Sequence, residues 1–338
     1  MIRGRASEEL LKFSKATGIP VANTFMGKGV VPWDYDLSLL SIGLQAHDYV
    51  NCGFDQADLV IAVGYDFVEY APSLWNPKRD KRIVHIDFTP SEVDAAYQPN
   101  IEIAADIRET LELLSPLIGE RKQLAFPKKL REYILSDLER CAKDDSSPVK
   151  PQRILRDLRE ELGRNDLVIS DVGAHKLWIA RMFLPAEPNT VIISNGFASM
   201  GIALPGAIAA KLIDPSRPVV AVCGDGGFLM NSHELETAVR LKLNPVILLF
   251  NDNGFGLIQA KQMKKFGRAF GVEFGNPDFV KFAESFGARG YRVEAARDFR
   301  KILKEALGLK VPSVIEIPID PQEHVRLMEQ LGHLVCPI

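Results

Sequence analysis

Short apolar runs alternate with amphipathic stretches along most of the chain. Runs closed by glycine or proline, such as residues 58–64 (DLVIAVG) and 81–88 (KRIVHIDF), are typical of strands buried on both faces of a parallel sheet. We also expect a helix that ends at Gly18, a strand at 19–25 and a helix at 107–117. Residues 1–118 are therefore predicted to form a doubly wound α/β domain.

The second half repeats this alternation more regularly. We expect six strands, at residues 167–170, 191–194, 219–223, 246–250, 291–293 and 313–318. The helices predicted around them cover residues 152–162, 176–183, 201–213, 232–241, 278–286 and 299–307. Strands joined by crossover helices form a parallel sheet with helices on both faces. Residues 151–338 are thus predicted to be a second α/β domain with a doubly wound parallel sheet.

Residues 119–150 differ from both halves because they are rich in charge and carry several prolines (GERKQ, PKKLRE, KDDSSPVKP). Segments of this composition bury little surface. We therefore interpret the stretch as an interdomain connection, with one helix at residues 130–141.

Composition excludes several classes of protein. Hydrophobic residues make up 46% and charged residues 25% of the chain, which excludes a disordered or collagen-like protein. A net charge of −3 gives no basic excess for nucleic-acid binding, and the apolar runs are far shorter than the roughly 20 residues of a membrane helix. The N-terminus has no apolar signal core, and the scattered cysteines 52, 141, 223 and 336 predict reduced thiols in a cytoplasmic protein.

Two loops that follow predicted strands hold the candidate chemistry. Residues 224–227 read Gly-Asp-Gly-Gly, and residues 251–256 read Asn-Asp-Asn-Gly-Phe-Gly. Ligands of open parallel sheets bind at the carboxyl ends of the strands. The glycine N–H groups suit phosphate, and a carboxylate beside a phosphate requires a cation. We therefore predict a Mg²⁺ and diphosphate site with Asp225 and Asp252 as carboxylate ligands.

Taken alone, either loop would usually be a simple turn. The separation of 27 positions between Asp225 and Asp252 favours the functional interpretation, because a strand–helix–strand unit takes about 30 residues and returns to the same sheet edge. The glycines do not match the GxGxxG nicotinamide fingerprint, no GxxxxGK[ST] phosphate loop is present, and the histidines show no zinc-site spacing.

These motifs resemble the thiamine diphosphate signature of pyruvate-oxidase-type enzymes. Residues 171–178 (DVGAHKLW), 194–210, 223–243 and 274–294 are similar to acetolactate synthase large subunits, and residues 57–77 and 84–107 resemble the central domain of the same enzymes. The resemblance covers roughly residues 2–330. It implies two doubly wound α/β domains, a central one incomplete at its start and one that binds thiamine diphosphate and Mg²⁺.

The resemblance also implies roles for individual residues. Asp225, Asp252 and the carbonyl of Gly254 would bind Mg²⁺, and the diphosphate would contact Gly226, Gly227, Ala174 and His175. Met200 would support the bent cofactor. The complete set implied for cofactor binding is Ala174, His175, Met200, Gly224, Asp225, Gly226, Gly227, Asp252, Gly254, Phe255, Gly256, Leu257 and Ile258.

Several of these positions have an alternative interpretation. His175 could be a surface histidine at a helix start, and Met200 a core methionine. Gln259, Lys261 and Gln262 could face substrate or form a solvated helix face. The glycine-containing residues 266–274 are expected to form a mobile cover over the site.

In the family, the cofactor decarboxylates pyruvate and the product is joined to a second 2-keto acid, giving acetolactate. This chemistry needs a glutamate from an N-terminal pyrimidine-binding domain. Residues 1–7 resemble the middle of the central domain, and no glutamate here matches the activating one, so we expect no catalytic residue of that kind in this chain. The chain resembles a C-terminal piece, from truncation or from a split enzyme.

The segment 65–70 (YDFVEY) departs from the FAD-binding pattern of biosynthetic members and favours the flavin-free, catabolic branch. Another 2-keto acid decarboxylase or carboligase, a thiamine diphosphate module without turnover, and a nucleotide-binding α/β protein remain alternatives. We expect a homo-oligomer or a partner chain that supplies the pyrimidine domain.

Overall fold

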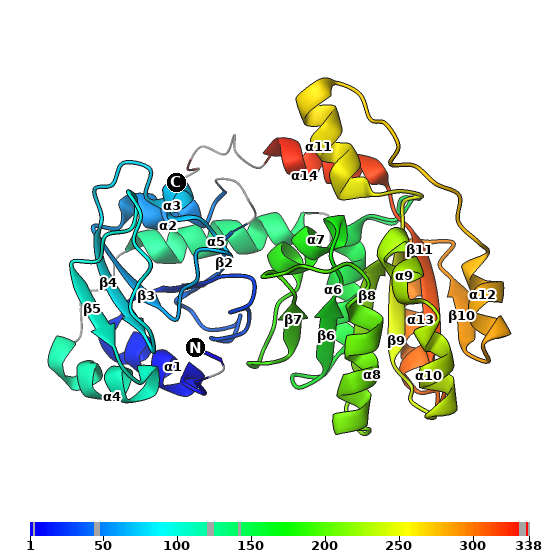
Figure 1. Cartoon of the computed structure of the whole chain (residues 1–338), viewed down its shortest axis with the longest axis horizontal. Coiled ribbons are helices and arrows are strands. Elements are labelled where there is room, and N and C mark those ends of the chain that lie inside the picture. Colours follow the sequence, from blue (N-terminus) through cyan, green and yellow to red (C-terminus); the bar gives the residue numbers. More distant parts are fainter. Residues whose placement is uncertain (3, 44–47, 120–124, 141–142, 331–335, 337–338) are drawn as a thin grey trace. The chain divides into compact units, whose positions relative to one another are not determined.

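The computed structural model describes residues 1–2, 4–43, 48–119, 125–140, 143–330 and 336 (Figure 1). The chain divides into two compact units. Unit 1 comprises Met1–Asp137 with Pro185–Asn189, and unit 2 comprises Leu138–Leu184 with Thr190–Gln330. Both units are α/β with parallel sheets, as the alternation of apolar runs and amphipathic stretches predicts.

Within its described residues, unit 1 has five strands in two separate sheets. Its elements are α1 (Ser7–Thr17), β1 (Val21–Asn23), β2 (Ser38–Ser41), α2 (Asn51–Gln56), β3 (Leu59–Val63), α3 (Pro72–Trp75), β4 (Arg82–Asp87), β5 (Ile101–Ala104), α4 (Ile107–Ile118) and α5 (Ala125–Glu139). One sheet pairs β1 with β2, and the other has the order β3-β4-β5. The strands predicted at 19–25, 58–64 and 81–88 are present, whereas β2 and β5 were not predicted.

Helices α1 and α4 pack together against one face of unit 1 (Figure 1). Their buried residues include Leu10 and Phe13 from α1 and Ile107 and Leu111 from α4. Gly18 ends α1 with a φ of 72°, a left-handed conformation that glycine adopts without strain. The predicted ends of α1 and α4 are thus confirmed to within a residue or so.

Helix α5 corrects the expectation that residues 119–150 bury little. It begins at Ala125, five positions before the predicted start, and it buries Leu130 and Ile134. Arg131 donates from Nη1 to the carbonyl of Ser38 (2.8 Å) and from Nη2 to that of Trp33 (2.7 Å). Leu130 and Ile134 are four positions apart and therefore lie on the same face of α5, which is the face that this charged helix buries. Cys141, at the predicted end of this helix, lies outside the described residues.

Unit 2 contains one continuous parallel sheet of six strands. Its elements are α6 (Pro151–Glu161), β6 (Leu167–Ser170), α7 (Ala174–Met182), β7 (Val191–Ile193), α8 (Ala203–Ile213), β8 (Val219–Gly224), α9 (Asp225–Asn231), α10 (Glu234–Arg240), β9 (Val246–Asn251), α11 (Gly256–Phe266), α12 (Phe279–Ser285), β10 (Arg289–Arg292), the 3₁₀ turn η1 (Ala296–Asp298), α13 (Phe299–Leu307), β11 (Ser313–Pro318) and α14 (Pro321–Gln330). The strand order is β10-β11-β9-β8-β6-β7. All six predicted strands are confirmed.

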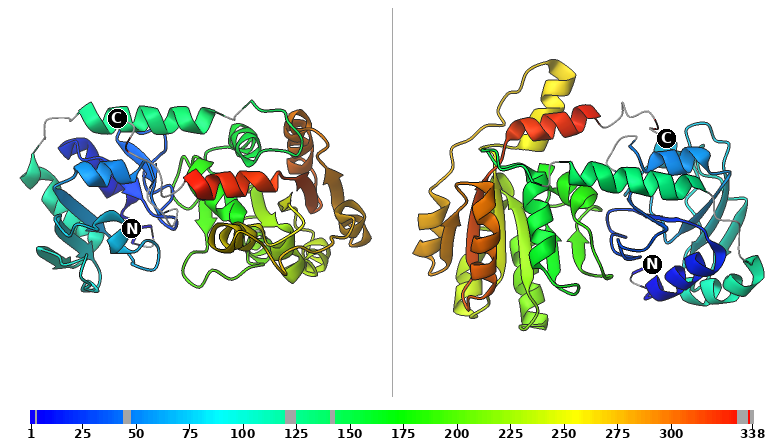
Figure 2. Two further views of the ribbon diagram at one scale, coloured as in Figure 1. Left: turned by 90° about the horizontal axis from the view of Figure 1, so that it is seen from above. Right: turned by 180° about the vertical axis from the view of Figure 1, so that it is seen from behind.

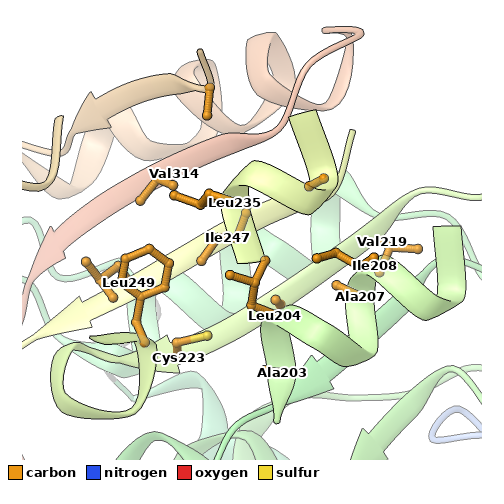
Figure 3. Close-up of a cluster of buried hydrophobic side chains, with 14 of the residues drawn as sticks. Ala203, Leu204, Ala207, Ile208, Val219, Cys223, Leu235, Ile247, Leu249 and Val314 are labelled. Carbon is orange, nitrogen blue, oxygen red and sulfur yellow. The ribbon is translucent and has the colours of Figure 1, made fainter. Parts of the chain in front are cut away.

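A cluster of apolar side chains fixes this sheet against its helices (Figure 3). Leu204 and Ile208 from α8 and Leu235 from α10 meet Ile247 and Leu249 from β9. Strands β8 and β9 are buried along nearly their whole length, which explains their uninterrupted apolar sequences. The predicted helix 232–241 is α10, but a separate helix, α9, precedes it directly after β8.

Helix α14 was not predicted. It lies alongside α11 (Figure 2). None of the helices within the described residues is long and apolar enough to cross a membrane. Cys52 and Cys223 are buried thiols.

Candidate functional site

The candidate site lies in unit 2, at the point where successive strands are added to opposite sides of β6. Strand β6 pairs with β7 on one side and β8 on the other, and β8 then pairs with β9. Such a switch point leaves an open crevice at the carboxyl ends of the strands. The segments after β6, β8 and β9 begin with Asp171, Asp225 and Asp252, so all three carboxylates lie at this edge.

One cavity of about 110 Å³ occupies this edge. All thirteen residues that the sequence assigned to the cofactor line it: Ala174, His175, Met200, Gly224, Asp225, Gly226, Gly227, Asp252, Gly254, Phe255, Gly256, Leu257 and Ile258. The structure adds Val172, Gly173, Phe250 and His324. The predicted residues therefore meet in one place, although they come from four segments of the chain.

Asp225 is the most enclosed carboxylate of the cavity, with 1% of its surface exposed. Its Oδ1 accepts from the N–H of Gly226 (2.8 Å), and its Oδ2 accepts from the N–H of Gly254 (3.2 Å). Burial raises the pKa of Asp225 to about 6, and the nearby charge of Asp252 acts in the same direction. Two carboxylates in this environment repel each other unless a cation lies close by.

Asn276, which the sequence did not single out, lies among the oxygens of this site. Its Nδ2 donates to Asp225 Oδ2 (2.7 Å), Asn251 Oδ1 (2.9 Å) and Asn253 Oδ1 (3.2 Å). Its own Oδ1 is buried without a hydrogen-bond partner. One amide group thus approaches three oxygens, the arrangement of ligands that a hard cation prefers.

Asp252 contacts a histidine of helix α14. Its Oδ2 lies 3.2 Å from Nε2 of His324, and Nε1 of Trp178 lies 3.0 Å from Nδ1 of the same ring. An indole N–H can only donate, so Nδ1 accepts and the proton of a neutral ring is on Nε2. The His324 ring therefore donates to Asp252 and orients its carboxylate.

His175 is buried, with 4% of its surface exposed, which rules out its interpretation as a surface histidine. Its ring donates to the main-chain carbonyl of Asp171, while Nε2 is buried without a hydrogen-bond partner. Burial lowers the pKa of His175 to about 4. The neutral ring thus leaves one acceptor nitrogen unused at the cavity, and a ligand could partner it.

Close packing explains the glycines of the two loops. A Cβ at Gly226 would lie 2.7 Å from Cε1 of Phe255, and one at Gly254 would lie 2.7 Å from the carbonyl oxygen of Val272. A Cβ at Gly256 would lie 2.1 Å from Oδ2 of Asp252. The backbone neighbour at Gly254 cannot move easily, so this position requires glycine, whereas a Cβ at Gly226 or Gly256 would force the facing side chain to shift.

The remaining predicted side chains are placed as follows. Met200 is half-buried and lines the cavity, so it is not a plain core methionine. Gln259 donates to Glu273 Oε1 (3.1 Å), and Gln262 exchanges hydrogen bonds with the main chain of Phe270. These glutamines and Lys261 do not line the cavity. The glutamines connect α11 to the glycine-containing segment after it.

Over the described part of the chain, no group of three or more His, Cys, Asp or Glu side chains could hold a metal ion. Asp225, Asp252, the asparagine amides and main-chain carbonyls therefore supply the candidate ligands. Tyr65, Asp66, Glu69 and Tyr70, from the segment compared with the FAD pattern, line a different cavity within unit 1.

Models of two domain families match the chain. Residues 1–114 match the central domain of thiamine pyrophosphate enzymes, and residues 171–317 match the C-terminal thiamine pyrophosphate-binding domain. Together the two matches cover most of the chain. The chain therefore belongs to the thiamine pyrophosphate enzymes.

Several curated relatives of the chain are named acetolactate synthases. The chain is 36% identical to acetolactate synthase of Bacillus subtilis (strain 168), an alignment that covers 96% of the chain and 58% of the relative. It is 40% identical to the catabolic acetolactate synthase of Raoultella terrigena, over 82% of the chain and 50% of the relative. It is 34% identical to a probable acetolactate synthase large subunit of Methanocaldococcus jannaschii, over 97% of the chain and 58% of the relative. The chain thus spans little more than half the length of these relatives.

Proposed function

We propose that this chain forms the central and diphosphate-binding part of an acetolactate synthase. The reaction is the decarboxylation of pyruvate and the transfer of the remaining two-carbon unit to a second 2-keto acid, with thiamine diphosphate and Mg²⁺. The observation that carries the proposal is the convergence of thirteen motif residues on one cavity. Similarity to acetolactate synthases supports the choice among 2-keto acid carboligases and decarboxylases.

The residues of the cavity fit a metal-bound diphosphate. Asp225 and Asp252 supply carboxylate oxygens, and Asn276 lies where its amide would give way to a cation or turn its unpartnered oxygen toward it. The unused Nε2 of His175 suits a hydrogen-bond donor or, once protonated, a phosphate oxygen. We include the carbonyl of Gly254 as a further Mg²⁺ ligand.

When bound, the cofactor would supply the carbon that attacks the 2-keto acid and the ring that takes up the electrons released with CO₂. The residues of this chain would bind and orient the cofactor. Asp225 and Asp252 would hold the metal ion that binds the diphosphate, and His324 orients the carboxylate of Asp252. Met200, Leu257 and Ile258 provide an apolar wall that supports the cofactor ring and excludes water.

The small volume of the cavity supports the proposal that another protein segment completes the site. Pockets that enclose a small molecule such as thiamine diphosphate usually measure about 300–1,000 Å³. This cavity measures about 110 Å³. We propose that it holds the diphosphate end, and that a pyrimidine-binding domain, from a partner chain or within a homo-oligomer, supplies the activating glutamate. Residues 1–118 and 151–338 would act as two domains joined by residues 119–150, in the cytoplasm and without FAD.

An assay of acetolactate formation from pyruvate, with thiamine diphosphate and Mg²⁺, tests the proposal. The chain should be inactive alone and active once a pyrimidine-binding domain of an acetolactate synthase is added as a separate chain. No activity in that mixture, despite cofactor binding seen by calorimetry, would favour the second candidate, a cofactor-binding module without turnover. An unchanged flavin absorption spectrum after mixing with FAD is also expected.

A further inference from the structure

Strand β11 of unit 2 contains a carboxylate within an otherwise apolar, buried run. Glu316 lies between Ile315 and Ile317, and 2% of its surface is exposed. The strand is an inner one, between β9 and β10. A charged group in the protein interior is costly unless it is hydrogen-bonded. Glu316 does not line the cavity of the candidate site, so its presence in this strand needs a separate explanation.

The hydrogen bond of Glu316 leads to the end of the neighbouring strand. Its Oε1 accepts from Nδ2 of Asn251, the last residue of β9 (2.7 Å). Its Oε2 is buried without a hydrogen-bond partner, and Nη1 of Arg292 lies 3.7 Å from it. The Arg292 side chain is half-exposed, and such ion pairs contribute little. The bond to Asn251 is therefore the contact on which a role of Glu316 rests.

This bond fixes the direction in which the amide of Asn251 faces. A carboxylate oxygen only accepts, so the amide presents its NH₂ group to Glu316 and its oxygen to the opposite side. That oxygen accepts from the N–H of Asn253 (3.1 Å) and from Nδ2 of Asn276 (2.9 Å). The same Nδ2 donates to Oδ2 of Asp225 (2.7 Å). The oxygen of Asn251 thus lies close to the carboxylate of the candidate cation site.

Without an acceptor at position 316, the amide of Asn251 would be free to turn over. Its NH₂ group would then face the N–H of Asn253, and two donors cannot bond to each other. The turned amide would also point N–H groups at a site built for a hard cation, which prefers oxygen. The loop that follows β9, which carries Asp252 and Gly254, would lose the bond that fixes its first turn.

We infer that Glu316 is a positioning residue of the cation site, because it holds the amide of Asn251 so that the end of β9 offers this site an oxygen and not an NH₂ group. The inference rests on the function proposed above, in which Asp225 and Asp252 hold Mg²⁺. Glu316 acts through Asn251 and does not touch the metal. Replacing residues that orient the groups of a metal site typically weakens metal binding by about 10- to 100-fold.

Calorimetric titration of the full chain with Mg²⁺, in the presence of thiamine diphosphate, tests this role. Glu316→Leu removes the acceptor, keeps a similar size and should weaken Mg²⁺ binding at least about tenfold. Its free energy of unfolding should not fall, since an apolar side chain suits a buried position between two isoleucines. A merely structural role predicts the reverse, a change in stability without a change in affinity. Unchanged Mg²⁺ affinity in Glu316→Leu overturns the inference.

Two control variants separate this bond from other effects on the strand. Ser313→Ala alters another fully buried polar side chain of β11, whose hydroxyl has no hydrogen-bond partner. Arg292→Leu removes the ion pair and leaves the bond to Asn251. Both should keep the Mg²⁺ dissociation constant within about twofold of the unmodified chain. A tenfold loss in either would show that a general disturbance of β11, or the charge of Arg292, is responsible, and would overturn the inference.

A double-mutant cycle tests whether Glu316 acts through Asn251. Asn251→Ala should weaken Mg²⁺ binding as much as Glu316→Leu, and the double variant should lose no more than either single one. Losses that multiply would overturn the inference. If Glu316→Leu does not fold, Asn251→Ala still decides, because unchanged affinity there has the same meaning. An unmodified chain that binds no Mg²⁺ would overturn the proposed function together with this inference, whereas binding that the variants do not weaken would overturn the inference alone.

Discussion

Strands alternate with helices in both units of this chain, but the sheets that these strands form differ between the units. In unit 2, six strands form one sheet, and β8 and β9 are buried almost completely. In unit 1, five strands form two sheets, and the apolar strand β3 is only partly buried. An apolar run thus predicts a strand reliably, but its burial depends on neighbours that other segments must supply.

The largest expected difference between the units concerns matched isoleucines. Ile247→Ala in β9 removes a fully buried side chain and should lower the free energy of unfolding by about 3–4 kcal/mol. Ile61→Ala in β3 should cost about 1 kcal/mol, because the side chain is partly exposed already. Urea denaturation of the two variants measures both values. Equal losses would mean that β3 is as well packed as β9.

The second effect is stabilisation by ligand, which should be confined to unit 2. Thiamine diphosphate and Mg²⁺ at about 100 times their dissociation constant should stabilise that unit by about 2.7 kcal/mol, and chelation of Mg²⁺ should remove the gain. Asp225→Asn should abolish it, since a metal ligand is lost, whereas Glu284→Gln on the surface of α12 should not. Hydrogen exchange with and without ligand measures this unit by unit. Protection of unit 1 alone would refute the site assignment.

A smaller effect, in unit 1, depends on pH. Burial lowers the pKa of Lys28 to about 7, whereas an unfolded lysine titrates near 10.5. Between these values the unfolded state binds more protons, so stability should rise with pH by about 2 kcal/mol from pH 7 to 9. Below pH 7 the contribution is constant, because both states are protonated. Lys28→Met should flatten the rise and the exposed Lys128→Met should not, as thermal denaturation across this range would show.

The smallest expected effect sharpens the description of the site in unit 2. Asn276→Ala removes the amide that approaches three oxygens near Asp225, and it should tighten Mg²⁺ binding by roughly fivefold, about 1 kcal/mol. Calorimetry with Mg²⁺ measures the change, and Asn244→Ala, remote from the site, is the control. Weaker binding in Asn276→Ala would instead identify the side-chain oxygen of Asn276 as a metal ligand.

Most strands and site residues of unit 2 could be predicted from the sequence, because each is marked by a short continuous stretch of the chain. Each of its strands is a continuous apolar run with a crossover helix, and the motif residues of the site follow those strands directly, so the fold brings Asp225 and Asp252 to one edge. The doubly wound α/β class of both units followed from the same alternation.

What sequence missed depends on tertiary contacts. Asn276 lies 51 positions from Asp225 in a stretch that resembles the family but follows no predicted strand, and His324 lies on a helix that was not predicted. Strand β5 has the sequence Ile-Glu-Ile-Ala and is largely exposed, so it carries no signal of a buried strand.

The position of β11 and α14 has a consequence for biosynthesis. Strand β11, near the end of the chain, lies between β9 and β10, and α14 after it carries the histidine that orients Asp252. Domains generally fold in the order in which the ribosome releases them. The sheet of unit 2 cannot close until β11 has left the ribosome. The contact that orients Asp252 forms later still, because it also requires α14.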